Sequence, residues 1–161
     1  MKHIIWFVSI FLLLIIVPFD ASRGVMKKVA FTTLVESSAN IVRGTVADMN
    51  SYWGDDHRAI YTDLTVAVSE QYKGDSGAGQ ITVTILGGNV DGLGLMVEDV
   101  PRFSNGQEVI LFLNPKGDVF QINCLYQGKY TVEDEVVVER GTAVTGFVAR
   151  ILDTIDVGEE R

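Results

Sequence analysis

Short runs of alternating apolar and polar residues, separated by glycine-rich turns, constrain the fold of this chain more than any other feature. Ile81, Val83 and Ile85 alternate with threonines, which is typical of a strand with one buried face. Tyr61–Tyr72 shows the same period less regularly, and Glu108–Leu113 is nearly all apolar, which indicates a strand buried on both faces. Closely spaced short strands predict a small barrel or sandwich rather than a βαβ sheet.

Two helices are expected to flank these strands. Phe31–Ser38 places its apolar residues on one face, with Thr32 or Thr33 as its N-cap. From Val144 to Ile155 apolar residues recur every three or four positions, which predicts an amphipathic C-terminal helix. The further strands that we expect are Ile41–Asp48, Leu95–Val97, Val119–Leu125, Lys129–Val132 and Val136–Val138. The irregular segments that we expect are the loop Asn50–Arg58, the glycine-rich connection Gly87–Gly94, the turn Asn114–Gly117 and the polar tail 158–161.

The N-terminus has the arrangement of an export signal. Lys2 and His3 precede an apolar run at Ile4–Val17, and small or polar residues follow at Asp20–Gly24. The apolar run is shorter than the roughly 20 residues that a helix needs to cross a bilayer. We therefore expect residues 1–24 to be a signal peptide that is cleaved, with retention as an uncleaved anchor as the alternative. The protein is expected to be extracytoplasmic: secreted, periplasmic or on the cell surface.

Residues 25–157 are expected to form a single domain with its own core. The formal net charge of the chain is −8, and the acidic residues are spread along the sequence. A nucleic-acid partner requires a basic face that neutralises phosphates, so nucleic acid is not an expected partner. An anionic membrane surface is disfavoured for the same reason, which leaves membrane contact only through an uncleaved N-terminal segment.

Residues suited to catalysis or metal binding are scarce. His57 is the only histidine beyond the N-terminal segment and Cys124 is the only cysteine, which is too few for a zinc site. His57 has no nucleophilic serine context, and the adjacent Asp55 and Asp56 lack the spacing of a calcium loop. The glycines of Gly87–Gly94 lack the Gly-Lys-Ser/Thr ending of a phosphate loop. We therefore expect no catalytic residues, no metal site and no cofactor.

The acidic cluster Glu133–Glu135 has two interpretations. Two neighbouring carboxylates are one requirement for acid catalysis. At the tip of a hairpin they are more simply solvated charges, because exposed carboxyl groups keep their ordinary acidity. We expect the solvated state.

The candidate ligand-binding residues lie in two expected loops. Tyr52 and Trp53 precede a glycine in the first loop, and aromatic residues are enriched at contact hot spots. The alternative for this pair is that it folds back as a lid on the core. Gly88, Asn89 and Asp91 belong to the glycine-rich connection, which is expected at the rim of the barrel.

Several short motifs resemble the netrin-like domain, which is the fold of the tissue inhibitors of metalloproteinases. Leu34–Glu36 followed by Ala39–Val46 is similar to its opening helix and strand, and the likeness continues at Tyr72–Gly74, Ile81–Val83 and Phe103–Leu113. The resemblance, which extends to uncharacterised exported microbial domains, implies a five-stranded OB-type barrel flanked by helices. Those inhibitors chelate the protease zinc through an N-terminal cysteine. This chain has no cysteine near the start of the domain, so that mechanism is not carried over.

The expected function is that of an exported, non-catalytic module that binds a protein. One alternative is an inhibitor of an extracellular peptidase that acts by loop insertion, without an N-terminal cysteine. A third hypothesis, less favoured than the other two, is a hydrolase of unfamiliar type that uses His57 and nearby carboxylates.

Overall fold

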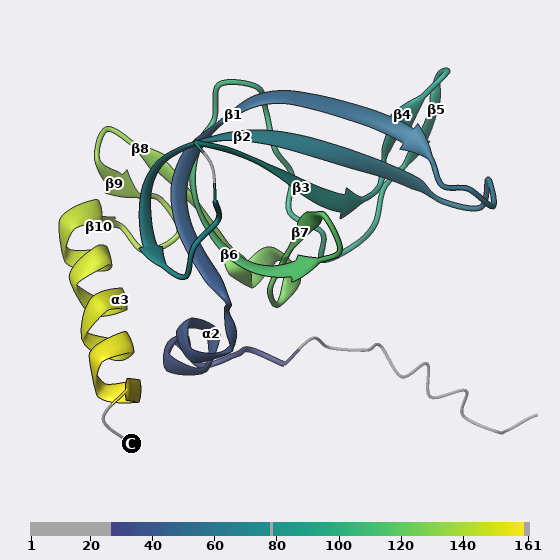
Figure 1. Ribbon diagram of the computed structural model, residues 1–161. Helices are drawn as coiled ribbons and strands as arrows, with labels where there is room; N and C mark the ends of the chain where they lie inside the picture. Colours follow the sequence, from purple (N-terminus) through teal and green to yellow (C-terminus); the bar gives the residue numbers. More distant parts are fainter. Residues whose placement is uncertain (1–26, 78, 160–161) are drawn as a thin grey trace, which may run out of the picture.

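The computed structural model describes residues 27–77 and 79–159 (Figure 1). The predicted signal peptide, residues 1–24, lies outside the described residues. The helices are α2 (Phe31–Ser37), the 3-10 turn η1 (Leu125–Gly128) and α3 (Val144–Glu159). The strands are β1 (Asn40–Trp53), β2 (Ile60–Lys73), β3 (Gln80–Leu86), β4 (Gly88–Val90), β5 (Leu93–Leu95), β6 (Glu108–Lys116), β7 (Val119–Ile122), β8 (Lys129–Glu133), β9 (Val136–Val137) and β10 (Thr142–Ala143).

Five of these strands close into a barrel. β1 pairs with β2 along one edge and with β6 along the other, both antiparallel. β2 continues to β3 and β6 continues to β7, and a parallel pairing of β3 with β7 at Val83 and Phe120 completes the ring. The order around the ring is β1-β2-β3-β7-β6. This arrangement confirms the predicted OB-type barrel with a short helix before it and a helix after it.

The barrel wall separates two apolar cores. Val109, Leu111 and Leu113 of β6 point into the barrel, and Ile110 and Phe112 point outward toward the helices. Successive side chains of a strand face opposite sides, so β6 contributes to both cores and its almost continuous apolar sequence is explained. All five side chains are fully buried. The prediction of a strand buried on both faces is confirmed.

Helix α3 covers the outer core. Phe147 is 1% exposed, and its ring lies 4.7 Å from that of Tyr130 and 5.4 Å from that of Phe31 in α2. The predicted caps Thr32 and Thr33 are wrong, because α2 begins earlier, with Ala30 at the N-cap. The predicted tail is wrong at residues 158 and 159, which continue α3, and residues 160–161 lie outside the described residues. Among the helices that are described, none is long and apolar enough to cross a membrane.

Several strands differ in length from the prediction. β1 extends to Trp53 because it stays paired with β2, so the predicted loop Asn50–Arg58 shrinks to residues 54–59. β6 runs through Pro115, since pairing with β7 continues to Lys116, and the turn follows it. The predicted strand Val119–Leu125 ends at residue 122, because Cys124 and Leu125 have left-handed backbone angles and begin η1. The predicted strand at Leu95–Val97 ends at residue 95.

Candidate functional site

The candidate residues Tyr52 and Trp53 lie on β1 and not in a loop, which corrects the prediction. They pair with Tyr61 and Ile60 of β2, and both side chains are half-buried. The hydroxyl of Tyr52 donates to Oδ1 of Asp63 at 3.2 Å. Burial, followed by the Asp63 carboxylate, raises the pKa of Tyr52 above its ordinary value.

His57 lies in the exposed turn between β1 and β2. Its ring is stacked on that of Trp53, with ring centres 6.4 Å apart and an angle of 5° between the planes. Its neighbour Asp56 accepts a hydrogen bond from the backbone N–H of Arg58. The Asp56 carboxylate therefore stabilises the turn instead of orienting His57 for catalysis. Within residues 27–77 and 79–159, no group of three or more His, Cys, Asp or Glu residues is placed to hold a metal ion.

The other candidate residues form a two-stranded ribbon, where the prediction had an irregular connection. β4 and β5 pair through Gly88 with Leu95, Asn89 with Gly94 and Val90 with Leu93. Asp91 and Gly92 form the two-residue turn, and both have positive φ angles, 53° and 80°. An Asp-Gly pair between apolar residues is a strong signal for such a hairpin, and this signal was overlooked in the sequence.

Gly88 fixes the ribbon against the end of the barrel. A Cβ at this position would lie 2.3 Å from Oγ1 of Thr62 and 2.4 Å from Oγ of Ser51, so a side chain does not fit. These two hydroxyls are 2.8 Å apart, and Thr62 also donates to the carbonyl oxygen of Gly87 at 2.7 Å. The backbone N–H of Asn89 donates to Ser51. The ribbon is therefore held over the barrel mouth by hydroxyl groups of β1 and β2.

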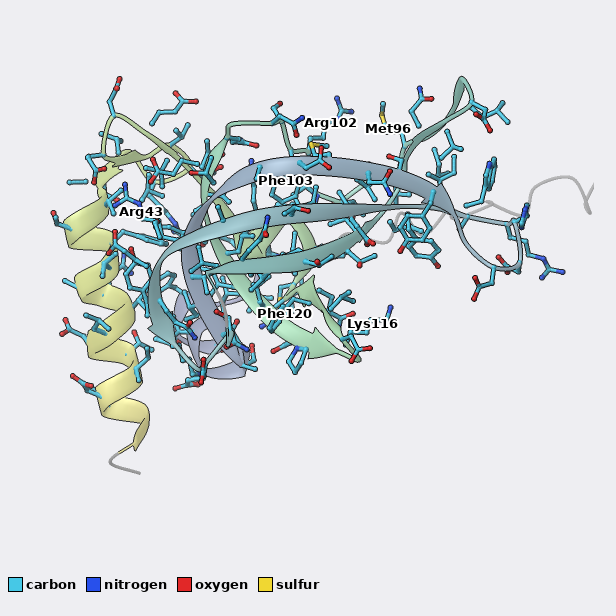
Figure 2. All side chains as sticks on the ribbon, turned by 45° about the horizontal axis from the view of Figure 1, so that its top comes forward. Arg43, Met96, Arg102, Phe103, Lys116 and Phe120 are labelled. Carbon is cyan, nitrogen blue, oxygen red and sulfur yellow. The ribbon has the colours of Figure 1, made fainter. Side chains whose placement is uncertain are left out.

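Below the ribbon lies a groove of about 530 Å³, which we call the mouth groove. It runs between the end of β1 and the segment 96–103 that leads from β5 to β6, and Figure 2 shows Met96, Arg102 and Phe103 along this side of β1. Its walls are mainly apolar. The lining residues are Met49, Ser51, Thr62, Ile85, Leu86, Gly87, Gly88, Asn89, Gly94, Leu95, Met96, Val97, Val100, Pro101, Arg102 and Phe103. A concave, mostly apolar site with a few polar groups is the usual form of a ligand site.

The rim of the mouth groove exposes large apolar side chains. Leu93, beside the hairpin turn, is 61% exposed and Met96 is 76% exposed. Nη2 of Arg102 donates to the sulfur of Met96 at 2.9 Å. Among the described residues, Arg102 has no carboxylate partner, whereas Arg43 is paired with three glutamates.

The structure brings only part of the predicted site together. Gly88 and Asn89 line the mouth groove, and Asp91 is exposed at the tip of the ribbon above it. Tyr52 and Trp53 do not line it. Most of the lining residues were not predicted, because the groove joins positions as far apart in sequence as 49 and 103.

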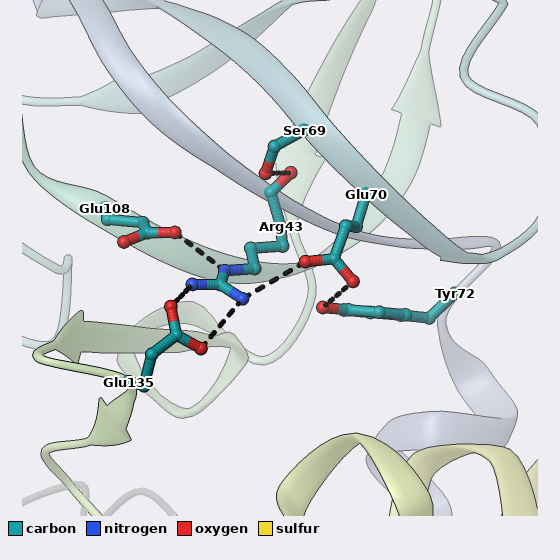
Figure 3. A network of polar contacts seen from close by, with 6 residues as sticks. All are labelled: Arg43, Ser69, Glu70, Tyr72, Glu108 and Glu135. Atoms are coloured by element: carbon teal, nitrogen blue, oxygen red, sulfur yellow. Dashed lines mark hydrogen bonds and ion pairs between the residues drawn. The ribbon is translucent and has the colours of Figure 1, made fainter. Parts of the chain in front are cut away.

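A second polar cluster lies at the other end of the barrel, around the buried Arg43 (Figure 3). Its Nε donates to Glu108 at 2.7 Å, its Nη1 donates to Glu70 at 3.1 Å, and Glu135 accepts from both Nη1 and Nη2. Tyr72 donates to the other oxygen of Glu70 at 3.2 Å. Because Arg43 joins β1, β2, β6 and the β8–β9 turn, we interpret this cluster as a structural clasp.

The clasp corrects the prediction of solvated charges for Glu135 alone, since Glu133 and Asp134 are exposed as predicted. The Glu135 side chain is 67% exposed, yet it is hydrogen-bonded to Arg43, which lowers the pKa of its carboxyl group. The hydrogen bond to Glu135 in turn raises the pKa of Arg43, and this effect exceeds the opposing effect of burial. Asp134 and Glu135 both have positive φ angles, so the ion pair also holds a turn that non-glycine residues rarely adopt.

Neither the known protein families nor the curated proteins supply a relative of this chain. No protein-family model matches this chain, and a search of curated proteins finds no match. The resemblance to the netrin-like domain therefore stays a prediction from the short motifs. The function must be argued from the geometry of the mouth groove.

Proposed function

We propose that the protein is an extracytoplasmic, non-catalytic module that binds a protein partner through the mouth groove. The observation that carries this proposal is the pairing of an apolar groove of about 530 Å³ with a rim that exposes Leu93 and Met96. Export is proposed from the N-terminal sequence pattern alone.

Exposing the apolar side chains of Leu93 and Met96 to water costs free energy unless a partner covers them. Leu93 and Met96 are the two most exposed of the large hydrophobic residues in the described chain. Burying such a side chain in an interface contributes about 1.5–3 kcal/mol, and methionine adapts well to the shape of a partner. Arg102 and the exposed Asp91 add polar groups beside these apolar side chains, and polar groups commonly surround the apolar centre of protein contacts.

Substitution of the rim tests the proposal. The tagged full-length chain is expressed in its own cells, and proteins that co-purify with it are compared between the wild type and variants. Leu93→Asp and Met96→Asp are expected to lose the partner, because each places a charge in the apolar contact. Leu152→Asp is the matched control, since Leu152 is 43% exposed on α3, away from the mouth.

Capture that is equal for the wild type and the Leu93→Asp and Met96→Asp variants would refute the mouth groove as the binding surface. A partner that is a peptidase, inhibited on binding, would make this module an inhibitor. The pair Tyr52 and Trp53 is tested in the same assay by the double Ala variant, and unchanged capture would remove them from the site.

A further inference from the structure

An unpaired strand edge borders the mouth groove at Met49. β1 pairs with β6 from Asn40 to Thr45, and Val46 then exchanges backbone hydrogen bonds with Gln107 and Gly106. From Ala47 onward, β1 pairs in the described chain only with β2, on its other side. We call the four residues 47–50 the free edge. Beyond it, β4 lies over Ser51.

The free edge is accessible. Ala47, Asp48 and Asn50 are exposed, and the half-buried Met49 points into the mouth groove. The pairing of β1 with β2 has a register shift between Val46 and Asp48. From Asp48 to Trp53, β1 is regular and in register with β2. A regular edge strand presents a row of backbone N–H and C=O groups that another extended chain can pair with.

We infer that the partner segment is an extended peptide that pairs with the free edge of β1, inserts a bulky apolar side chain into the mouth groove and places a carboxylate on Arg102. The inference rests on the proposed function and specifies its ligand. It combines main-chain pairing for affinity with a pocket for a side chain, which is how strand addition achieves specificity.

The choice of a carboxylate follows from charge. Arg102 lines the groove and is exposed, and its guanidinium has no acidic partner among the residues described. A guanidinium binds a carboxylate through two parallel hydrogen bonds, which fixes the register of a bound peptide. An aspartate or glutamate side chain and a free C-terminus supply the same chemistry.

Gly94 is a position at the groove where a bulky side chain can be added without straining the fold. It lies opposite Asn89 in the ribbon, both residues line the groove, and a Cβ at Gly94 would meet no atom within 4 Å. Gly94→Trp therefore adds a bulky ring beside the groove, from a Cβ that overlaps no described atom. Gly146→Trp is the matched control, because Gly146 is exposed on α3 and a Cβ there is equally unobstructed.

The experiment selects decapeptides from a random phage-displayed library on the immobilised full-length chain. The expected peptides carry a bulky apolar residue close to an Asp, a Glu or the C-terminus. Binding of the enriched peptide is expected to fall at least about tenfold with Gly94→Trp and with Arg102→Gln, and to be unchanged with Gly146→Trp. Amidating the C-terminus distinguishes the two carboxylate sources.

Methylation of single peptide nitrogens tests the strand pairing itself. Only alternate residues of an added strand direct their N–H toward the neighbouring edge, so we expect losses of about tenfold at the one or two alternate positions opposite residues 47–50 and little effect elsewhere. Hydrogen exchange at residues 47–50 is expected to slow when the peptide binds. These readouts do not depend on a variant that could fail to fold.

Two results would overturn the inference. One is the absence of any peptide enriched over selection on the Gly94→Trp variant. The other is an enriched peptide whose affinity is unchanged by methylation at any position. If rim variants still abolish capture of a cellular partner, the proposed function stands and only the extended-peptide inference fails. If capture is also insensitive to the rim, both fail.

Discussion

Replacing Arg43 by methionine should destabilise the domain in a pH-dependent way. Methionine keeps most of the side-chain length while removing the charge that three glutamates share. The side chain of Arg43 is 10% exposed, and those of Glu108, Glu70 and Glu135 are 36%, 50% and 67% exposed. Because solvent screens these partners, the pairs with Glu70 and Glu108 contribute only about 0.2–1 kcal/mol each, and we expect Arg43→Met to lower the free energy of unfolding by about 1–2 kcal/mol at pH 7.

The pH dependence follows from the carboxylates. Arg43 lowers the pKa of Glu135 in the folded state. The ion pair therefore stabilises the fold at pH values above the pKa that Glu135 has in the unfolded chain, and this stabilisation is lost as the pH falls through the lower pKa of the folded state. The difference between wild type and Arg43→Met should therefore shrink in acid.

Urea unfolding followed by circular dichroism, at pH 7 and at about pH 3, measures both free energies. Arg102→Met is the control, because Arg102 has no ion pair in the described chain and its change in unfolding free energy should stay within about 0.5 kcal/mol. A difference for Arg43→Met that equals the control, or that is the same at both pH values, would refute the account of the clasp.

Three further predictions concern the fold around the site. Gly88→Ala should lower the free energy of unfolding in urea by about 1–3 kcal/mol, because its Cβ would overlap Oγ1 of Thr62 and its φ of 142° disfavours a side chain. Gly146→Ala should not destabilise the domain, and equal effects of the two substitutions would contradict the packing of the ribbon. Phe147→Ala should cost about 3–5 kcal/mol, since its 1% exposed ring joins α3 to the barrel; a cost below about 1 kcal/mol would mean that α3 is not docked as described. Burial and Glu70 raise the pKa of Tyr72 above that of an ordinary phenol, so Tyr72→Phe should remove the latest phase of the tyrosinate absorbance titration, and loss of an earlier phase would be inconsistent with this.

The barrel strands could be predicted from the sequence, because the local periodicity of apolar residues indicates which side chains are buried. The strict alternation of Ile81, Val83 and Ile85 predicts a strand with one apolar face, and β3 has that form. The continuous apolar run of β6 likewise reflects two cores. Strand ends were less predictable, because β1 is extended to Trp53 by pairing with β2, and residues Asn50–Trp53 show no alternation of apolar and polar residues.

The mouth groove could be predicted only in part. The glycine spacing predicts an irregular connection that includes Gly88 and Asn89, whereas the Asp91–Gly92 turn makes their segment a ribbon. Met49 and Phe103 come to line the same groove only after the ring of five strands has closed. Such a site depends on tertiary structure, and neither residue is distinctive in the sequence.

The most direct test of the proposed function is site-specific photo-crosslinking in the producing cells. A photoreactive phenylalanine analogue replaces Met96 at the rim of the mouth groove in the full-length chain, and a second chain carries it at Leu152 on α3. Binding through the mouth predicts a discrete cross-linked protein with the probe at position 96, absent with the probe at position 152 and lost when Gly94→Trp is added. Cross-linking that is absent at position 96, or equal at both positions, would contradict the account.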